Sequence, residues 1–271
     1  MGVSVSRRCK MSIRKAVVKV AVCFIASLPA FAGAILYDNG PLVTHPGGGY
    51  GGADASRLQA NSLGMSTIGF GNQASLGYRI ADDFTVPEGG WTIGKIVFFA
   101  YQTGSPTSPS PITGYYLQIW DGPPNSTGSS IIFGDLTTNR LVSSIWSGIY
   151  RDTESSEGNS QRPIMASTVA VNTFLGPGTY WLDWMVDGSS SYTGPWAPPI
   201  TILGQTVTGN ALQYTGAWGF VTDSGTGTQQ GFPFIIYAAD EAVIPEPGTA
   251  SLLVLGTGLL GLLLAARRRK A

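Results

Sequence analysis

The segment GTYWLDWMVDG, residues 178–188, carries polar and aromatic side chains at a spacing that suits the binding of a sugar. Successive side chains of a β-strand point to opposite faces of the sheet. One face would present the indole of Trp181 and the carboxylates of Asp183 and Asp187 to solvent. A sugar ring stacks on an indole while its hydroxyls bond to carboxylates. The opposite, apolar face is expected in the core and consists of Tyr180, Leu182, Trp184 and Val186.

A second segment, YYLQIW at residues 115–120, alternates in the same way. One of its faces is formed by Tyr116, Gln118 and Trp120, and the other by Tyr115, Leu117 and Ile119. We therefore predict a ligand platform built from Tyr116, Trp120, Trp181 and Asp183. One alternative stays open, because tryptophan and tyrosine also pack in the cores of β-sandwiches and a strand can be buried on both faces.

Catalytic constellations are sparse in the sequence. A pair of carboxylates can hydrolyse a glycosidic bond, but Asp82 and Asp83 are adjacent and would point to opposite faces of a strand. His45, the single histidine, lies in the glycine-rich stretch VTHPGGGYGG, which is a poor support for a catalytic triad, and no G-x-S-x-G motif is present. We predict that the protein is not an enzyme, with a polysaccharide-active hydrolase or lyase as the alternative.

The sequence also offers few ligands for a cofactor. Both cysteines, Cys9 and Cys23, precede residue 35, and a single histidine without cysteines excludes the common zinc sites. We predict no metal site and no cofactor. A structural calcium ion held by a loop carboxylate such as Asp121 or Asp223 is the alternative.

The distribution of charge excludes one class of partner. Between Ile35 and Ile244 there are six basic and fifteen acidic side chains, which gives 6 − 15 = −9. Nucleic-acid binding requires a basic face, so it is not expected here. Cations or neutral polymers such as polysaccharide are the more plausible neighbours of this acidic region.

The segments that carry these side chains have the sequence pattern of β-strands. Short apolar or alternating runs are separated by clusters of Gly, Pro, Asn and Ser, and no helical period is visible between the two ends of the chain. Strands are expected at 78–86, 91–103, 115–120, 130–135, 141–151, 165–174, 178–187, 200–207, 210–216 and 231–239. This number and spacing predict an antiparallel β-sandwich of jelly-roll or immunoglobulin-like form over residues 78–243. Residues 35–77 are glycine-rich, and we expect at most a strand or two there.

The N-terminus has the organisation of a secretory signal peptide. Basic residues up to Lys19 precede an apolar stretch at 20–34 that ends in Ala32-Gly33-Ala34, a small-x-small cleavage site. We predict a signal peptide at residues 1–34, processed by signal peptidase after passage through the secretion translocon, and a mature chain that begins at Ile35. Met11 is an alternative start, and an uncleaved membrane anchor is an alternative reading of the segment.

The C-terminus carries a second targeting segment. Pro245-Glu246-Pro247 is followed by 18 uncharged residues, 249–266, which is at the threshold for a membrane-spanning helix. Arg267, Arg268, Arg269 and Lys270 come next, and such a basic cluster stays on the cytoplasmic side. We predict a single transmembrane helix with the preceding domain outside, and a plain type I membrane protein is the simplest alternative.

Residues 244–271 together resemble the PEP-CTERM sorting signal of Gram-negative bacteria. The resemblance implies that exosortase recognises Pro245-Glu246-Pro247 and that Arg267 to Arg269 complete the signal. It implies an inner-membrane anchor that is transient, followed by release to the cell surface or the extracellular space. Phrases such as DDFTVP, YLQIWDGPP and GTYWLDW also resemble exported domains found with such signals, but no known activity accompanies them.

The resemblance implies a role as well. In these systems the signals accompany exopolysaccharide production, so we expect a non-enzymatic component of a matrix, floc or biofilm. A carbohydrate-binding module is the alternative outside enzymology. An exposed aromatic strip without an inward carboxylate pair would favour binding, and such a pair in a groove would favour the hydrolase.

Overall fold

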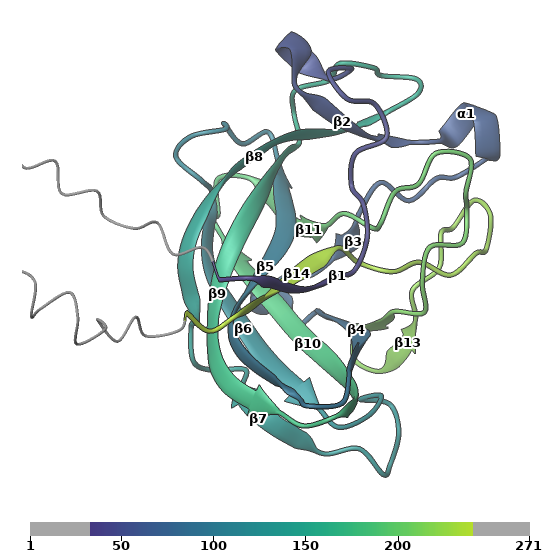
Figure 1. Ribbon diagram of the computed structural model, residues 1–271. Helices are drawn as coiled ribbons and strands as arrows, with labels where there is room; N and C mark the ends of the chain where they lie inside the picture. The colour runs from purple at the N-terminus through teal and green to yellow at the C-terminus, as the bar shows by residue number, and fades with distance from the viewer. Residues whose placement is uncertain (1–32, 241–271) are drawn as a thin grey trace, which may run out of the picture. The chain divides into compact units, whose positions relative to one another are not determined.

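The computed structural model describes residues 33–240, which form two β-sheets (Figure 1). The predicted signal peptide up to residue 32, the transmembrane helix at 249–266 and the tail lie outside the described residues. Within residues 33–240, no helix is long and apolar enough to cross a membrane. The longest run of α-helix in this range is α1 (Ala60–Leu63), and two short 3-10 turns, η1 (Tyr50–Gly52) and η2 (Ala74–Leu76), accompany it.

The larger sheet has eight strands. They are β1 (Ile35–Asp38), β2 (Asp54–Leu58), β3 (Phe70–Gly71), β5 (Trp91–Thr103), β8 (Leu141–Thr153), β9 (Pro163–Leu175), β11 (Thr193–Ala197) and β14 (Phe234–Ala238). The order is β1-β14-β5-β9-β8-β2, and β11 pairs with β5 and with β3. Within it, β2 and β8 run parallel and the other pairs are antiparallel.

The smaller sheet has six strands, all paired antiparallel. They are β4 (Arg79–Val86), β6 (Ile112–Trp120), β7 (Ile131–Asp135), β10 (Gly178–Gly188), β12 (Leu212–Tyr214) and β13 (Trp218–Phe220). The order β13-β12-β4-β10-β6-β7 places the two strands of the predicted platform, β6 and β10, side by side.

A core of aromatic and branched aliphatic side chains from both sheets lies between them. Phe98 of β5 contacts Trp184 of β10, with ring centroids 4.8 Å apart, and Tyr115 of β6, with ring centroids 5.6 Å apart. The all-β, two-sheet architecture is therefore confirmed. The assignment of Leu182, Trp184 and Val186 to the core face is also confirmed, because all three are buried in this cluster.

The strand predictions are confirmed from β4 to β10, and three parts of the prediction are wrong. Residues 200–207 form no strand: Gly204 has a φ of 80°, Leu203 and Val207 are exposed, and the Ile202 carbonyl accepts from the Gln59 side chain. Two strands, β11 and β13, are absent from the prediction. Residues 35–77 contain three strands, where at most two were expected, and each pairs with a strand of the larger sheet.

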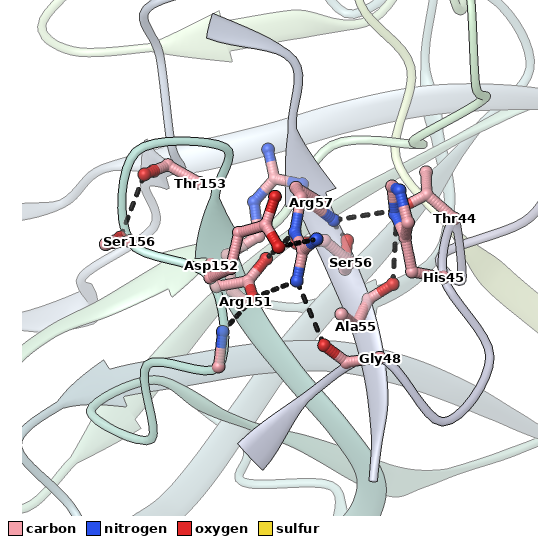
Figure 2. A network of polar contacts seen from close by, with 12 residues as sticks. Thr44, His45, Gly48, Ala55, Ser56, Arg57, Arg151, Asp152, Thr153 and Ser156 are labelled. Carbon is pink, nitrogen blue, oxygen red and sulfur yellow. Dashed lines mark hydrogen bonds and ion pairs between the residues drawn. The ribbon is translucent and has the colours of Figure 1, made fainter. Parts of the chain in front are cut away.

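A buried ion pair fixes β2 against β8 (Figure 2). Arg57 donates from Nε to Asp152 Oδ1 at 3.0 Å and from Nη2 to Asp152 Oδ2 at 2.8 Å, and the Asp152 side chain is fully buried. Arg57 Nη2 also donates to the Gly48 carbonyl, and the Gly158 amide donates to Asp152. This two-point pairing of guanidinium and carboxylate ties two loops and two strands together.

Arg151, the neighbour of Asp152, is fully buried and donates only to neutral groups among the described residues. Its Nε bonds to the Ile68 carbonyl at 2.8 Å, and its Nη1 bonds to Ser56 Oγ at 3.0 Å and Thr201 Oγ1 at 2.9 Å. The side chain thus joins three segments that are distant in sequence, and it keeps its charge without a carboxylate partner.

Candidate functional site

The structure brings the four predicted platform residues onto one face of the smaller sheet. In the register of β10 with β6, Trp181 lies opposite Trp120, Asp183 opposite Gln118, and Met185 opposite Tyr116. This face points away from the core that the two sheets share, because the alternate residues of both strands are the ones in that core. We call it the outer face, and its further residues from β12 and β13 are Tyr214, Trp218 and Phe220.

The predicted exposure is wrong for two of the four residues. Trp181 is 6% exposed and Asp183 is 0% exposed. Trp181 packs with Ala81 and Leu212, and Trp120 and Trp218 cover this small cluster. Strands β12 and β13 extend the sheet and bring their own large side chains onto the same face. Replacing Trp181 would therefore test stability rather than ligand contact.

Asp183 is a buried carboxylate at the centre of the outer face. Its Oδ2 accepts from Arg79 Nη1 at 3.0 Å and from Trp120 Nε1 at 3.3 Å. Its Oδ1 is buried and has no hydrogen-bond partner among the described residues. Burial raises the pKa of Asp183 to about 7, against the opposing effects of the Arg79 charge and the Trp120 hydrogen bond.

Arg79 connects this carboxylate to the β12–β13 hairpin. Its guanidinium lies over the ring of Tyr214, 4.4 Å from the centroid, and over the ring of Trp218 at 4.9 Å. A cation over an aromatic face is held by the ring quadrupole. Sequence reasoning missed Arg79 and the hairpin. Two aromatic residues, Tyr214 and Trp218, flank the turn residues Thr215 to Ala217. This pattern could have indicated the hairpin.

The accessible part of the outer face is aromatic at one end and polar at the other. Phe220 is 63% exposed, and Trp120 and Trp218 are partly exposed. At the other end, the Tyr116 hydroxyl donates to Asp187 Oδ2 at 2.8 Å. These two residues border a pocket of about 420 Å³ that is also lined by Ala74, Ser75, Leu136, Thr137 and Met185.

The acidic residues considered for catalysis or calcium have structural partners. Asp82 is buried in the core face of β4 and Asp83 is on the opposite face, as predicted. Asp223 accepts hydrogen bonds from the backbone N–H groups of Ser66, Thr67, Gly225 and Thr226, and Asp121 accepts from Ser130. Within residues 33–240, no three His, Cys, Asp or Glu side chains form a cluster that could hold a metal ion.

His45 lies on the loop between β1 and β2. Its Nδ1 is 3.0 Å from Thr44 Oγ1, and its backbone is bridged to Ala55 next to the Arg57 network (Figure 2). Its ring nitrogens contact no carboxylate among the residues described, so the structure brings no triad together around it.

Comparison with known protein families gives a match at the C-terminus. The sequence profile of the PEP-CTERM protein-sorting motif matches residues 243–270. The chain carries a PEP-CTERM sorting motif. The predicted resemblance at the C-terminus is thereby confirmed, and the match includes Pro245-Glu246-Pro247 and the basic residues Arg267 to Lys270. No curated protein and no solved structure matches the chain.

The PEP-CTERM motif implies export, processing by exosortase and sorting to the cell surface. It begins three residues after Asp240, where the described part of the chain ends. Just before that point, the Ala238 amide donates to the Ala34 carbonyl at 2.8 Å, and β1 begins at Ile35. The segment that leads to the PEP-CTERM motif therefore leaves the sandwich beside the start of the predicted mature chain.

Proposed function

We propose that the exported domain is a non-enzymatic β-sandwich that associates with exopolysaccharide in a matrix, floc or biofilm through the accessible part of its outer face. The observation that carries this proposal is the combination of a PEP-CTERM motif with the exposed Phe220 and the partly exposed Trp120 and Trp218 on one sheet face. Aromatic rings at a surface offer flat apolar area on which the faces of sugar rings stack.

The polar end of the outer face supports the same ligand class. The Tyr116–Asp187 pair lies at a pocket edge with carboxylate and hydroxyl oxygens that accept from sugar hydroxyls. Asp183 does not take part directly, because it is buried beneath Trp120 and engaged by Arg79. Its role is to hold the Trp120 indole and the Arg79 guanidinium in place, and through Arg79 the rings of Tyr214 and Trp218.

The hydrolase alternative is favoured by one observation. The pKa of Asp183 is raised by burial, and Asp187 lies on the same strand face, as a general acid and a second carboxylate would. Against it, Asp183 is inaccessible and ion-paired. Release of reducing ends from an exopolysaccharide by the wild type, abolished in Asp187→Asn, would favour the hydrolase.

We also propose that the precursor is anchored in the inner membrane, that signal peptidase cleaves after Ala34, and that exosortase removes the C-terminal segment. The major surface form should then begin at or near Ile35 and lack Arg267 to Lys270. Intact-mass analysis of the surface fraction measures both ends at once. A major surface form that retains the four basic residues would contradict this processing.

Binding at the outer face is tested by removing its most exposed ring. We expect Phe220→Ala to reduce retention on the host exopolysaccharide about fivefold, because one stacked aromatic contributes about 1 kcal/mol. The matched control is Phe174→Ala on β9, since Phe174 is 62% exposed and Phe220 is 63% exposed. Both variants should melt like the wild type. Equal loss of retention in the two variants, or in neither, would refute an outer-face site.

A further inference from the structure

A second pocket lies beside β3, β5 and β11 of the larger sheet, away from the outer face. Its volume is about 370 Å³, which is in the range of ~300–1,000 Å³ for small-molecule sites. Its lining consists of Ser66, Thr67, Ile68, Gly69, Tyr101, Thr103, Arg162, Thr193, Trp196 and Ser224. Hydroxyl groups, two aromatic rings and one guanidinium therefore face the same space.

The pocket gathers positive charge in an acidic domain. Arg57, Arg79 and Arg140 form ion pairs with carboxylates, whereas Arg151 and Arg162 form none within residues 33–240. Arg162 lines the pocket and is partly exposed. Arg151 lies behind it and donates to the carbonyl of Ile68, another lining residue. A guanidinium in a concave site without a carboxylate partner favours an anionic ligand.

Tyr101 gives an independent indication of a ligand. It is 1% exposed and lines the pocket, and its hydroxyl is not one of the fully buried polar atoms of the described residues that lack a partner, so the oxygen reaches the pocket space. Burial raises the pKa of Tyr101 to about 12, while the charges of Arg151 and Arg162 oppose that rise. The hydroxyl is therefore a neutral donor close to two cations. A side chain at Gly69 would collide with this hydroxyl, so glycine keeps the space in front of it open.

A carboxylate next to the hydroxyl cluster, Asp223, acts on the charge of Arg151 together with Asp152, but it forms no ion pair with either pocket cation among the described residues. Asp223 accepts hydrogen bonds from four backbone amides, and such bonds stabilise the ionised carboxylate. Above it, Ser224 Oγ bonds to Ser66 Oγ at 2.8 Å and to Thr67 Oγ1 at 2.9 Å. These hydroxyls form a neutral rim on one side of the pocket.

We propose that this pocket binds a sugar unit that carries a carboxylate, such as a hexuronate residue of an acidic polysaccharide. The planar guanidinium of Arg162 matches the two oxygens of a carboxylate, and Trp196 offers a partly exposed ring for the sugar face. Tyr101 and the Ser and Thr hydroxyls supply donors and acceptors for ring hydroxyls. This site is separate from the outer face and does not depend on binding there.

The test is titration of the processed full protein with sodium D-glucuronate, D-glucose and sodium sulfate, followed by calorimetry and tryptophan fluorescence. We expect glucuronate to bind and glucose to bind at least about tenfold more weakly. Arg162→Gln should weaken glucuronate binding by about the same factor, and Gly69→Ala should weaken it as well. The control Lys95→Gln removes the same charge from a side chain that lies over Tyr237 and should leave binding unchanged.

Four results would overturn the proposal. The first is equal binding of glucuronate and glucose, and the second is unchanged glucuronate binding in Arg162→Gln with a wild-type melting temperature. The third is equal loss in Lys95→Gln, which would indicate only a net-charge effect, and the fourth concerns sulfate. Sulfate that binds as tightly as glucuronate would exclude a sugar site in favour of a general oxyanion site. Phe220→Ala should keep full glucuronate binding, so a failure of the outer-face proposal is distinguishable from a failure here.

Discussion

Replacing Asp152 by alanine is expected to lower the free energy of unfolding by ~3–5 kcal/mol. Asp152 is fully buried, and its two oxygens accept from Arg57 and from the Gly158 amide. Its removal leaves the Arg57 guanidinium in a site where 5% of the side chain is exposed, without its main counter-charge. The parallel pair β2/β8 then loses its ion pair and keeps only the Arg151–Ser56 side-chain bond. Urea denaturation followed by tryptophan fluorescence measures the loss.

Glu157→Ala is the matched control for this experiment. Glu157 contacts the same guanidinium at 3.1 Å, but its side chain is 62% exposed. Exposed ion pairs contribute only ~0–1 kcal/mol, so this variant should unfold close to the wild type. Similar destabilisation in both variants would show that the exposed partner of Arg57 stabilises the fold as much as the buried partner does. That result would contradict our interpretation of the network.

The folded domain is expected to lose stability as the pH rises from about 4 to 7. Burial raises the pKa of Asp82 from 3.8 to about 7, although the Phe232 and Asp83 amides and the Asn39 side chain donate to it. Between these two pH values the unfolded chain has released a proton that the folded protein still holds. The unfolding free energy therefore falls with pH in this window, by about 4 kcal/mol for Asp82 alone.

The slope of stability against pH in a variant separates the contribution of Asp82 from that of Asp183, whose pKa burial also raises to about 7. Asp82→Asn keeps the site uncharged at every pH, so the decline between pH 4 and 7 should become shallower, whatever the variant's absolute stability. Asp135→Asn is the control, because hydrogen bonds from Thr137 and Thr138 lower the pKa of Asp135 and it stays ionised through most of this window. A wild-type slope in Asp82→Asn would refute the assignment.

The sequence predicts the long strands because their patterns are local. β5 and β10 are apolar or alternating runs of more than ten residues bounded by turn residues, so their limits agree with the structure. Strand β11 lies in a cluster of Gly, Pro and Ser, and β13 has only three residues, so neither has a pattern long enough to be recognised. Residues 200–207 have the composition of a strand. They form a loop instead, because the Gln59 side chain bonds to the Ile202 carbonyl and the chain turns at Gly204.

The sequence predicted which face of the sheet carries the platform residues, but it did not predict that Trp181 and Asp183 are buried. Alternation places Trp181 and Asp183 on the side of the sheet that faces away from the shared core, whatever covers that side. Their cover comes from Arg79, Trp218 and Leu212, which reach them only through the pairing of β4 with β10 and β12. Arg79 and Asp183 are 104 positions apart, and no local pattern connects residues at such a distance.

Strand β14 imposes an order on export. It is the last strand of the described chain, yet it lies inside the larger sheet, between β1 and β5 (Figure 1). In a chain that crosses the membrane from its N-terminus, β1 waits without a partner until residues 234–238 emerge, and an unpaired edge is prone to aggregation. Only six residues, 239–244, lie between Ala238 and Pro245. In such a chain the larger sheet therefore closes only when the residues next to the PEP-CTERM motif have emerged, so the motif follows the last strand of the fold by a few residues.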